Sequence, residues 1–153
     1  MHKLIGVLML TTIAACSGQS GAASPEAAVG GVVAAARAYD AAKAASFFPT
    51  PEALAEVLDC PADAPLLRRV VELRAGLADE LPGMGQVAFI RRESDSDMVR
   101  SFAAGDAVDA CRAKGDLAVL RTRIVFGAAG GREESDMMRF IQLGGRFYLT
   151  DRW

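Results

Sequence analysis

The chain has 153 residues, of which 52% are hydrophobic and 24% charged, and its 17 basic and 19 acidic side chains leave a formal net charge of -2. This length suits a single domain, and a chain so apolar buries enough surface to fold, which excludes an intrinsically disordered protein. The even mixture of charges also excludes a nucleic-acid-binding protein, because counterion release needs clustered positive side chains.

The N-terminus has the pattern of an export signal. A basic start ending at Lys3 is followed by an apolar run of 12 residues before Cys16. Spanning the hydrocarbon core of a bilayer takes roughly 20 apolar residues, so this run is too short for a permanent span. It predicts a signal peptide that is removed from the mature protein.

The residues that end this run resemble the bacterial lipoprotein signal-peptidase box, in which small residues precede a lipid-modified cysteine. Here Ile13, Ala14 and Ala15 precede Cys16. The resemblance implies cleavage before Cys16, a diacylglycerol on its thiol and acylation, as with palmitate, of the new amino group. Several acyl chains anchor a protein stably, whereas one chain binds a membrane only marginally. An ordinary secretory signal cleaved after Ala22 or Ala23 is the alternative.

The residues after Cys16 predict where the protein is held. Lipoproteins retained at the inner membrane tend to have aspartate next to the cysteine, whereas this chain has Ser17. The resemblance therefore favours a lipid anchor at the periplasmic face of the outer membrane, with surface exposure left open. Residues 17–24 are small and polar, which is typical of a flexible tether. We expect a signal peptide at 1–15, a tether at 16–24 and one domain at 25–153.

The signal peptide contains the one histidine of the chain, His2. Once it is removed, hydrolysis by a serine or cysteine with a histidine base is excluded. Zinc, iron or copper held by histidine is excluded as well. We therefore predict no catalytic residue, no cofactor and no metal site.

Two cysteines, Cys60 and Cys111, are left once Cys16 is lipidated. The expected compartment is oxidising, and the pair has neither the C-x-x-C spacing of redox sites nor a further soft metal ligand. We predict a structural disulfide between them. Closing a loop of about 50 residues stabilises a fold by roughly 4 kcal/mol in the chain-entropy description.

The first half of the chain predicts three helices. Ser24, a capping residue before a proline, begins a helix expected to extend to about residue 47. Thr50 caps a second helix that ends at residues 59–61. Apolar residues at steps of three and four predict a third helix over residues 65–80. Its expected core residues are Leu66, Val70, Leu73, Leu77 and Leu81.

The second half has the composition of strands. We predict strands over residues 87–92, 117–126 and 137–143, and a last strand over 146–153 after a two-glycine hairpin. Residues 93–97 are acidic and serine-rich and predict a turn, while 98–102 fit a strand or a short helix. The expected fold is α+β, with N-terminal helices packed on a C-terminal curved antiparallel sheet.

This order of elements resembles the nuclear-transport-factor-2-like cone fold. The resemblance is carried by the turn Lys114, Gly115 and Asp116 before a strand and by the hairpin over residues 140–149. It covers residues 26–153 and implies a cone-like cavity between the helices and the sheet. It implies no function, because the same fold serves enzymes and inert scaffolds.

Two classes of function stay open. The first is a non-catalytic, lipid-anchored module that binds a protein or a small apolar ligand. The second is an isomerase or dehydratase-like enzyme, in which an aspartate acts as base and a tyrosine stabilises an enolate. The missing histidine and the lack of a convergent acid–base set favour the module. The candidate groups for the enzyme are Tyr39, Tyr148, Asp40, Asp106, Asp109 and Asp151.

Other polar clusters are expected to be structural. Arg121, Arg123 and Arg139 would form a cationic patch for an anionic ligand or a cell-wall polymer, but pairing with acids on neighbouring strands is favoured. The glycines of residues 127–131 lead into a strand, whereas a phosphate-binding loop leads into a helix. Two acidic groups lack the full oxygen-ligand loop of a calcium site. They are Asp95 with Asp97, and Glu133 with Glu134 and Asp136.

Overall fold

The fold is taken from a computed structural model in which residues 20–150 are described. The predicted signal peptide, the lipidation site Cys16 and the candidate acid Asp151 lie outside the described residues. Within residues 20–150, no helix is both long enough and apolar enough to cross a bilayer.

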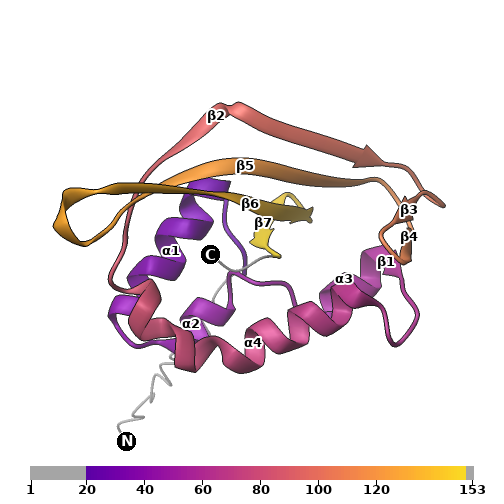
Figure 1. The fold of residues 1–153 in the computed structure, drawn as a ribbon. Helices are drawn as coiled ribbons and strands as arrows, with labels where there is room; N and C mark the ends of the chain where they lie inside the picture. Colours follow the sequence, from indigo (N-terminus) through magenta and orange to yellow (C-terminus); the bar gives the residue numbers. More distant parts are fainter. Residues whose placement is uncertain (1–19, 151–153) are drawn as a thin grey trace, which may run out of the picture.

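Helices come first along the described chain and strands follow (Figure 1). The helices are α1 (Pro25–Arg37), α2 (Ala41–Ala45), α3 (Pro51–Val57) and α4 (Pro65–Met84). The main sheet has the antiparallel order β2-β5-β6-β7, from β2 (Ala88–Phe102), β5 (Leu117–Gly127), β6 (Glu133–Leu143) and β7 (Arg146–Leu149). The small sheet has the order β1-β4-β3, from β1 (Leu58–Asp59), β3 (Ala107–Val108) and β4 (Cys111–Ala113). The 3-10 turn η1 (Ala129–Gly131) joins β5 to β6. The predicted α+β fold with a curved antiparallel sheet is confirmed.

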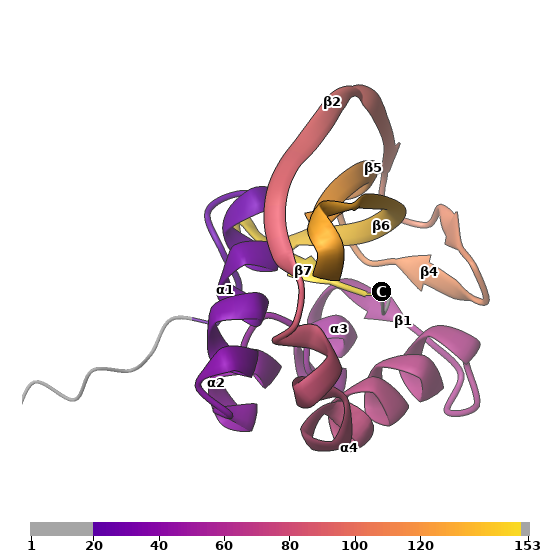
Figure 2. The same cartoon turned by 60° about the vertical axis from the view of Figure 1, so that its left-hand side comes forward.

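Each face of the main sheet carries a hydrophobic core. Side chains of α1, α2 and the C-terminal part of α4 pack on one face, and side chains of α3 and the small sheet pack on the other. Figure 2 shows α1 and β4 on opposite sides of the main sheet. Helix α4 serves both cores, because Leu66 and Val70 belong to the second and Leu73 and Leu77 to the first.

The predicted helix starts are confirmed. The hydroxyl of Ser24 accepts a hydrogen bond from the amide of Ala27 at 3.1 Å, and that of Thr50 accepts one from Ala53 at 3.1 Å. A proline stands at the start of each of these helices. The predicted third helix is also present and ends later than expected, at Met84.

The single helix predicted from residue 25 to about 47 is wrong. Helix α1 ends at Arg37, and Tyr39 follows in the left-handed backbone region with φ 53°, which interrupts a helix. The chain then folds back through α2 until the ring of Phe47 lies over Gly31. A Cβ on Gly31 would come within 2.2 Å of that ring, so the missing side chain makes room for the reversal.

The predicted turn at residues 93–97 is also wrong, because this segment lies inside β2. Residues 94–97 lie opposite one residue of β5, Thr122, and so form a β-bulge with three extra residues. The hydroxyl of Ser96 accepts a hydrogen bond from the amide of Arg123 at 2.7 Å and donates one to the carbonyl of Glu93 at 2.5 Å. The hydroxyl of Ser96 thus makes hydrogen bonds to backbone groups at the bulge, and the strand continues beyond it.

The remaining strand boundaries differ by a few residues. Strand β6 begins at Glu133 rather than residue 137, because its polar first half pairs with β5 through backbone bonds. The hairpin at Gly144 and Gly145 is confirmed, with φ 55° and 76°. Strand β7 ends at Leu149, and residues 151–153 are outside the described part.

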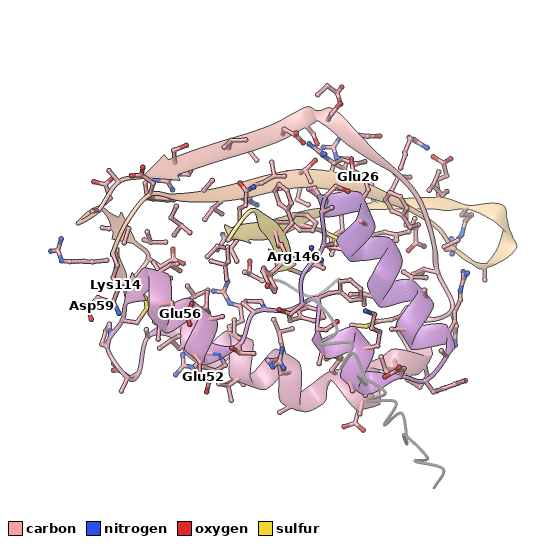
Figure 3. The ribbon with its side chains drawn as sticks, turned by 180° about the vertical axis from the view of Figure 1, so that it is seen from behind. Glu26, Glu52, Glu56, Asp59, Lys114 and Arg146 are labelled. Carbon is pink, nitrogen blue, oxygen red and sulfur yellow. A yellow bond between two sulfur atoms is a disulfide. The ribbon has the colours of Figure 1, made fainter. Side chains whose placement is uncertain are left out.

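The folded part begins before Pro25. Ala22 and Phe147 exchange two backbone hydrogen bonds at 3.0 and 2.8 Å, and Arg146 donates to the carbonyl of Gly21 at 2.7 Å. Figure 3 places Arg146 near the middle of the molecule, beside this segment. A Cβ on Gly21 would lie 2.6 Å from the ring of Tyr148, so the contact requires glycine. Residues 20–22, assigned to the tether by composition, therefore pack on β7.

The predicted disulfide between Cys60 and Cys111 is confirmed, at a sequence separation of 51 residues. It connects the residue after β1 to the first residue of β4. The small sheet itself was not predicted, because strands of two and three residues are too short to produce a period-two pattern. The bond therefore fixes the β3–β4 hairpin, which has few backbone pairs of its own.

We predict that reducing the disulfide lowers the free energy of unfolding by about 4 kcal/mol, since a loop of about 50 residues is then free in the unfolded state. Urea unfolding with and without dithiothreitol measures this difference. The double variant Cys60→Ala/Cys111→Ala is the control, and its stability should not respond to the reductant. An unchanged midpoint for the reduced wild-type protein would contradict the prediction.

Candidate functional site

A cavity of about 240 Å³ lies on the face of the main sheet opposite α1. Its walls are three strands of the main sheet, the β3–β4 hairpin, the first turn of α4 and the residue after β7. The lining residues are Leu66, Met98, Arg100, Phe102, Ala107, Val108, Asp109, Val119, Arg121, Arg139, Ile141 and Thr150.

The sheet register explains which side chains reach this cavity. Met98 of β2 lies opposite Arg121 of β5, which lies opposite Arg139 of β6. In the next row on the same face, Arg100, Val119 and Ile141 lie opposite one another. Directly opposite side chains on adjacent strands are close neighbours, with Cβ atoms about 5 Å apart. These two rows form the sheet wall of the cavity.

The β2 bulge decides which residues of β2 belong to these rows. It adds three residues to β2 relative to β5, and an odd insertion exchanges the two faces of everything beyond it. With uninterrupted pairing, Val99 would face the cavity. With the bulge, Met98 and Arg100 face it, and Val99 points outward with 64% of its surface exposed.

Three charged side chains hold the bulge. Arg92 donates to both carboxylate oxygens of Asp97, and its other nitrogen donates to Glu26 of α1 at 2.8 Å. Arg92 and Asp97 are only 19% and 22% exposed, so their attraction is screened less than that of a surface pair. This network ties the bulge to the first turn of α1. Figure 3 shows Glu26 at the sheet end of that helix.

The same contacts shift the pKa values of all three groups. The hydrogen bond from Arg92 holds the pKa of Asp97 below its ordinary range, and the same bond raises the pKa of Arg92. Partial burial acts to raise the pKa of Glu26. Hydrogen bonds from its own backbone and from Arg92 outweigh burial, so the pKa of Glu26 is lowered too. Both carboxylates are therefore stabilised in their charged form.

The cavity has an apolar floor and a charged rim. Leu66, Val108 and Ile141 on the floor are 5%, 7% and 2% exposed. Arg100 and Arg121 are exposed at the rim, and Arg139 has 29% of its side chain exposed. A ligand here would meet hydrocarbon below and guanidinium groups above.

Asp109 is the one acidic residue among the cavity-lining residues. It stands at the tip of the β3–β4 hairpin with φ 52°, a conformation that aspartate tolerates better than most residues. Its carboxylate lies 3.9 Å from a guanidinium nitrogen of Arg139. Three arginines against one aspartate give the lining a formal charge of +2.

The expected pairing with acids on neighbouring strands holds for one of the three arginines, Arg123, while the acid near Arg139 comes from the β3–β4 hairpin. Arg123 lies 3.3 Å from Glu93 on the neighbouring strand, and Arg139 lies near Asp109. Arg121 has no ion pair or hydrogen bond from its side chain to any described residue. The cationic face considered from the sequence therefore exists in part, with Arg100 added and Arg123 outside the lining.

The tyrosines proposed for the enzyme alternative do not line this cavity. Tyr39 is 74% exposed, and the hydroxyl of Tyr148 shares a hydrogen bond with that of Ser20 at 3.0 Å. Asp40 and Asp106 cap backbone amides of Lys43 and Ala103. The only aspartate among the described candidates that reaches the cavity is Asp109.

The cone-fold resemblance implies a cavity between the helices and the sheet, and among the helices of residues 20–150 only α4, through Leu66, lines the cavity together with the sheet. The space between α1 and the sheet is filled by core side chains, including Val29, Val32, Ile124 and Phe140, each 0% exposed. A ligand site on that face would require their displacement. The cavity lies on the other face, between the sheet, the start of α4 and the small sheet.

The acidic clusters have structural partners or lie dispersed. Asp97 bonds Arg92, and Glu133 lies 3.0 Å from Arg91. Figure 3 shows Glu52, Glu56 and Asp59 around α3 and β1, and the side chain of Lys114 donates to the carbonyl of Ala55 in α3. Across residues 20–150, no group of three or more histidine, cysteine or acidic side chains is placed to hold a metal ion.

Comparison with known proteins gives no relative: no protein-family model, curated protein or solved structure matches the chain. The cavity itself is therefore the basis for inferring function. Sequence reasoning singled out Arg121 and Arg139 but missed Met98 and Arg100, whose direction depends on the bulge.

We predict that Asp97→Asn lowers the free energy of unfolding at pH 7 by about 1 kcal/mol and flattens its acid dependence. The pKa values of Asp97 and Glu26 lie below their ordinary 3.8 and 4.5 in the folded state. Their stabilisation is thus complete above those values and is lost as the pH falls through the lowered pKa values. Urea unfolding between pH 7 and pH 3 measures this slope.

The matched control for this prediction is Asp95→Asn, an exposed aspartate of the same bulge. It should keep the wild-type stability at pH 7 and the wild-type acid slope. Equal losses in the two variants would assign the effect to net charge, and would contradict a specific role for the Arg92 network.

Proposed function

We propose that this chain is a lipid-anchored protein of the bacterial envelope whose domain binds a small, partly apolar ligand without catalysing a reaction. The observation that carries this proposal is the cavity, with its buried apolar floor and its arginine rim. Ligand sites in proteins combine mainly apolar walls with a few polar groups that fix orientation. This cavity has both features.

Two observations support the location. The sequence up to Cys16 has the basic start, apolar run and small residues of a lipoprotein signal. The Cys60–Cys111 disulfide is typical of proteins exported to an oxidising compartment such as the periplasm. With several acyl chains on Cys16, the domain would stay at the membrane, and we place it at the periplasmic face of the outer membrane.

The enzyme alternative has less support from the geometry. It needs a carboxylate and a tyrosine hydroxyl within hydrogen-bond reach of one substrate. Asp109 is at the cavity, but its carboxylate faces Arg139, and the hydroxyl of Tyr148 is bonded to Ser20. Among residues 20–150, the lining therefore offers binding groups rather than an acid–base pair.

We predict that Cys16→Ala moves the protein from the membrane fraction to the soluble periplasmic fraction, because the thiol that accepts the lipid is gone. Fractionation followed by immunoblotting measures the change. Ser17→Ala changes the neighbouring residue and should leave the protein in the membrane fraction. Membrane association of the Cys16→Ala protein would contradict the anchor.

We predict that the soluble Cys16→Ala protein binds 1-octanol in the cavity. Octanol is a neutral probe small enough for about 240 Å³. Methyl NMR should give saturable shifts at Leu66, Val119 and Ile141, while Val29 in the opposite core stays unchanged. Filling the cavity with Val119→Phe should abolish the shifts.

The control for Val119→Phe is Val99→Phe, which adds the same ring at an exposed position on the face of the sheet opposite the cavity. It should leave octanol binding intact. The absence of saturable shifts in the wild-type cavity with octanol and with anionic octyl probes would overturn the binding function.

A further inference from the structure

We propose that the ligand of this cavity is an amphiphilic oxyanion, a carboxylate or phosphate on a short apolar body, and that Arg121 and Arg139 bind the anionic group. This inference rests on the proposed binding function and names the class of ligand. Three features of the cavity carry it, namely a like-charged pair of neighbours, a local excess of positive charge, and the division between rim and floor.

The like-charged pair is Arg121 and Arg139, which lie directly opposite each other on β5 and β6. Like charges in this position destabilise a sheet, since the side chains are neighbours. Asp109 stands 3.9 Å from Arg139, which has further contacts within the protein, whereas the Arg121 side chain has no ion pair or hydrogen bond to a described residue. An oxyanion beside Arg121, within reach of Arg139, would offset the repulsion between the two guanidinium groups.

The charge excess is local. The whole chain carries a formal charge of -2, whereas the cavity lining carries +2 from three arginines and one aspartate. Arg100 places its guanidinium 5.3 Å from the ring centre of Phe102, a cation–π contact, and has no acidic partner within residues 20–150. Arg121 has no acidic partner among the described residues. An anion would therefore be drawn to this side of the molecule.

The division between rim and floor sets the orientation of the ligand. Guanidinium groups bind carboxylate and phosphate through paired hydrogen bonds, and Arg121 and Arg139 stand in one row, directly opposite each other on β5 and β6. Below them, Val119, Ile141 and Leu66 offer hydrocarbon. The anionic group would stay near water at the mouth, while the apolar body would enter the cavity.

The size of the cavity limits the ligand. Pockets for drug-sized molecules have about 300–1,000 Å³, whereas this one has about 240 Å³. A chain of about eight carbons or a single ring would fit, and the long tails of membrane lipids would extend beyond it. We therefore assign a short amphiphile, and the two headgroup chemistries are distinguished by experiment.

The test compares three probes with the same octyl chain, octanoate, octyl phosphate and octanol, on the soluble Cys16→Ala protein by methyl NMR titration. We expect at least one anionic probe to bind at least about tenfold more tightly than octanol, because charge-assisted hydrogen bonds are added to the same apolar contact. The tighter anion identifies the headgroup. Raising NaCl from 0.05 to 0.5 M should weaken anion binding and leave octanol binding unchanged.

Arg121→Gln tests the residue that carries the proposal. We expect this variant to lose most of the anion preference, bringing it below about threefold, while its affinity for octanol stays at the wild-type value. The matched control is Arg132→Gln, which removes the same charge from a side chain 78% exposed and outside the cavity. Asp109→Asn keeps a residue that tolerates positive φ and removes the competing carboxylate, so anion affinity should rise several-fold.

The outcomes separate this inference from the binding function. If octanol binds and neither anion binds more tightly, the ligand class is wrong although the cavity binds. If Arg132→Gln weakens anion binding as much as Arg121→Gln, the effect is one of net charge and the assignment of Arg121 is overturned. If none of the three probes binds, the function itself fails.

Discussion

The composition of the cavity lining depends on the β-bulge in β2. Three extra residues in one strand exchange the faces of the following segment, so a single local device decides whether Arg100 or Val99 points inward. The bulge leaves backbone groups without ladder partners, and it is held by Arg92 bridging Asp97 and Glu26 and by the hydroxyl of Ser96. The first turn of α1 thus takes part in positioning residues on the opposite face of the sheet. A contact on one side of the molecule controls the composition of a cavity on the other.

Sequence patterns predicted those parts of the fold that rest on local chemistry. Ser24 and Thr50 mark helix starts because their hydroxyls satisfy amides only three residues away. The alternating pattern of β5 and the two glycines before β7 also predicted a strand and a hairpin, because both patterns are local. The disulfide was predicted from the number of cysteines and from the oxidising compartment that the N-terminal signal leads us to expect. These features need no knowledge of distant partners.

What the sequence did not reveal depends on long-range contacts. The break at Tyr39 reflects the packing of Phe47 on Gly31, and the order of residues 20–22 reflects Arg146 and β7, more than 120 residues away. The acidic run at 93–97 looks like a turn because its polar residues bond backbone, and only the facing strand makes it a bulge. Arg121 and Arg139 were identifiable from the sequence as a pair on the sheet. Met98 and Arg100 were not, because the bulge decides which face of the sheet they occupy. Strands of two or three residues leave no pattern at all.

The early start of the folded part constrains how the domain would stand on a membrane. Ser20 and Gly21 are bonded to Arg146. With an anchor on Cys16, four peptide units separate the lipid from that bonded segment. An extended chain covers at most about 3.5 Å per residue, so the span is about 14 Å, less than half the thickness of a bilayer's hydrocarbon core. A domain anchored in this way would lie close to the lipid headgroups and could not move far into the periplasm. Its reach would then be restricted to molecules that arrive at, or leave from, the membrane surface.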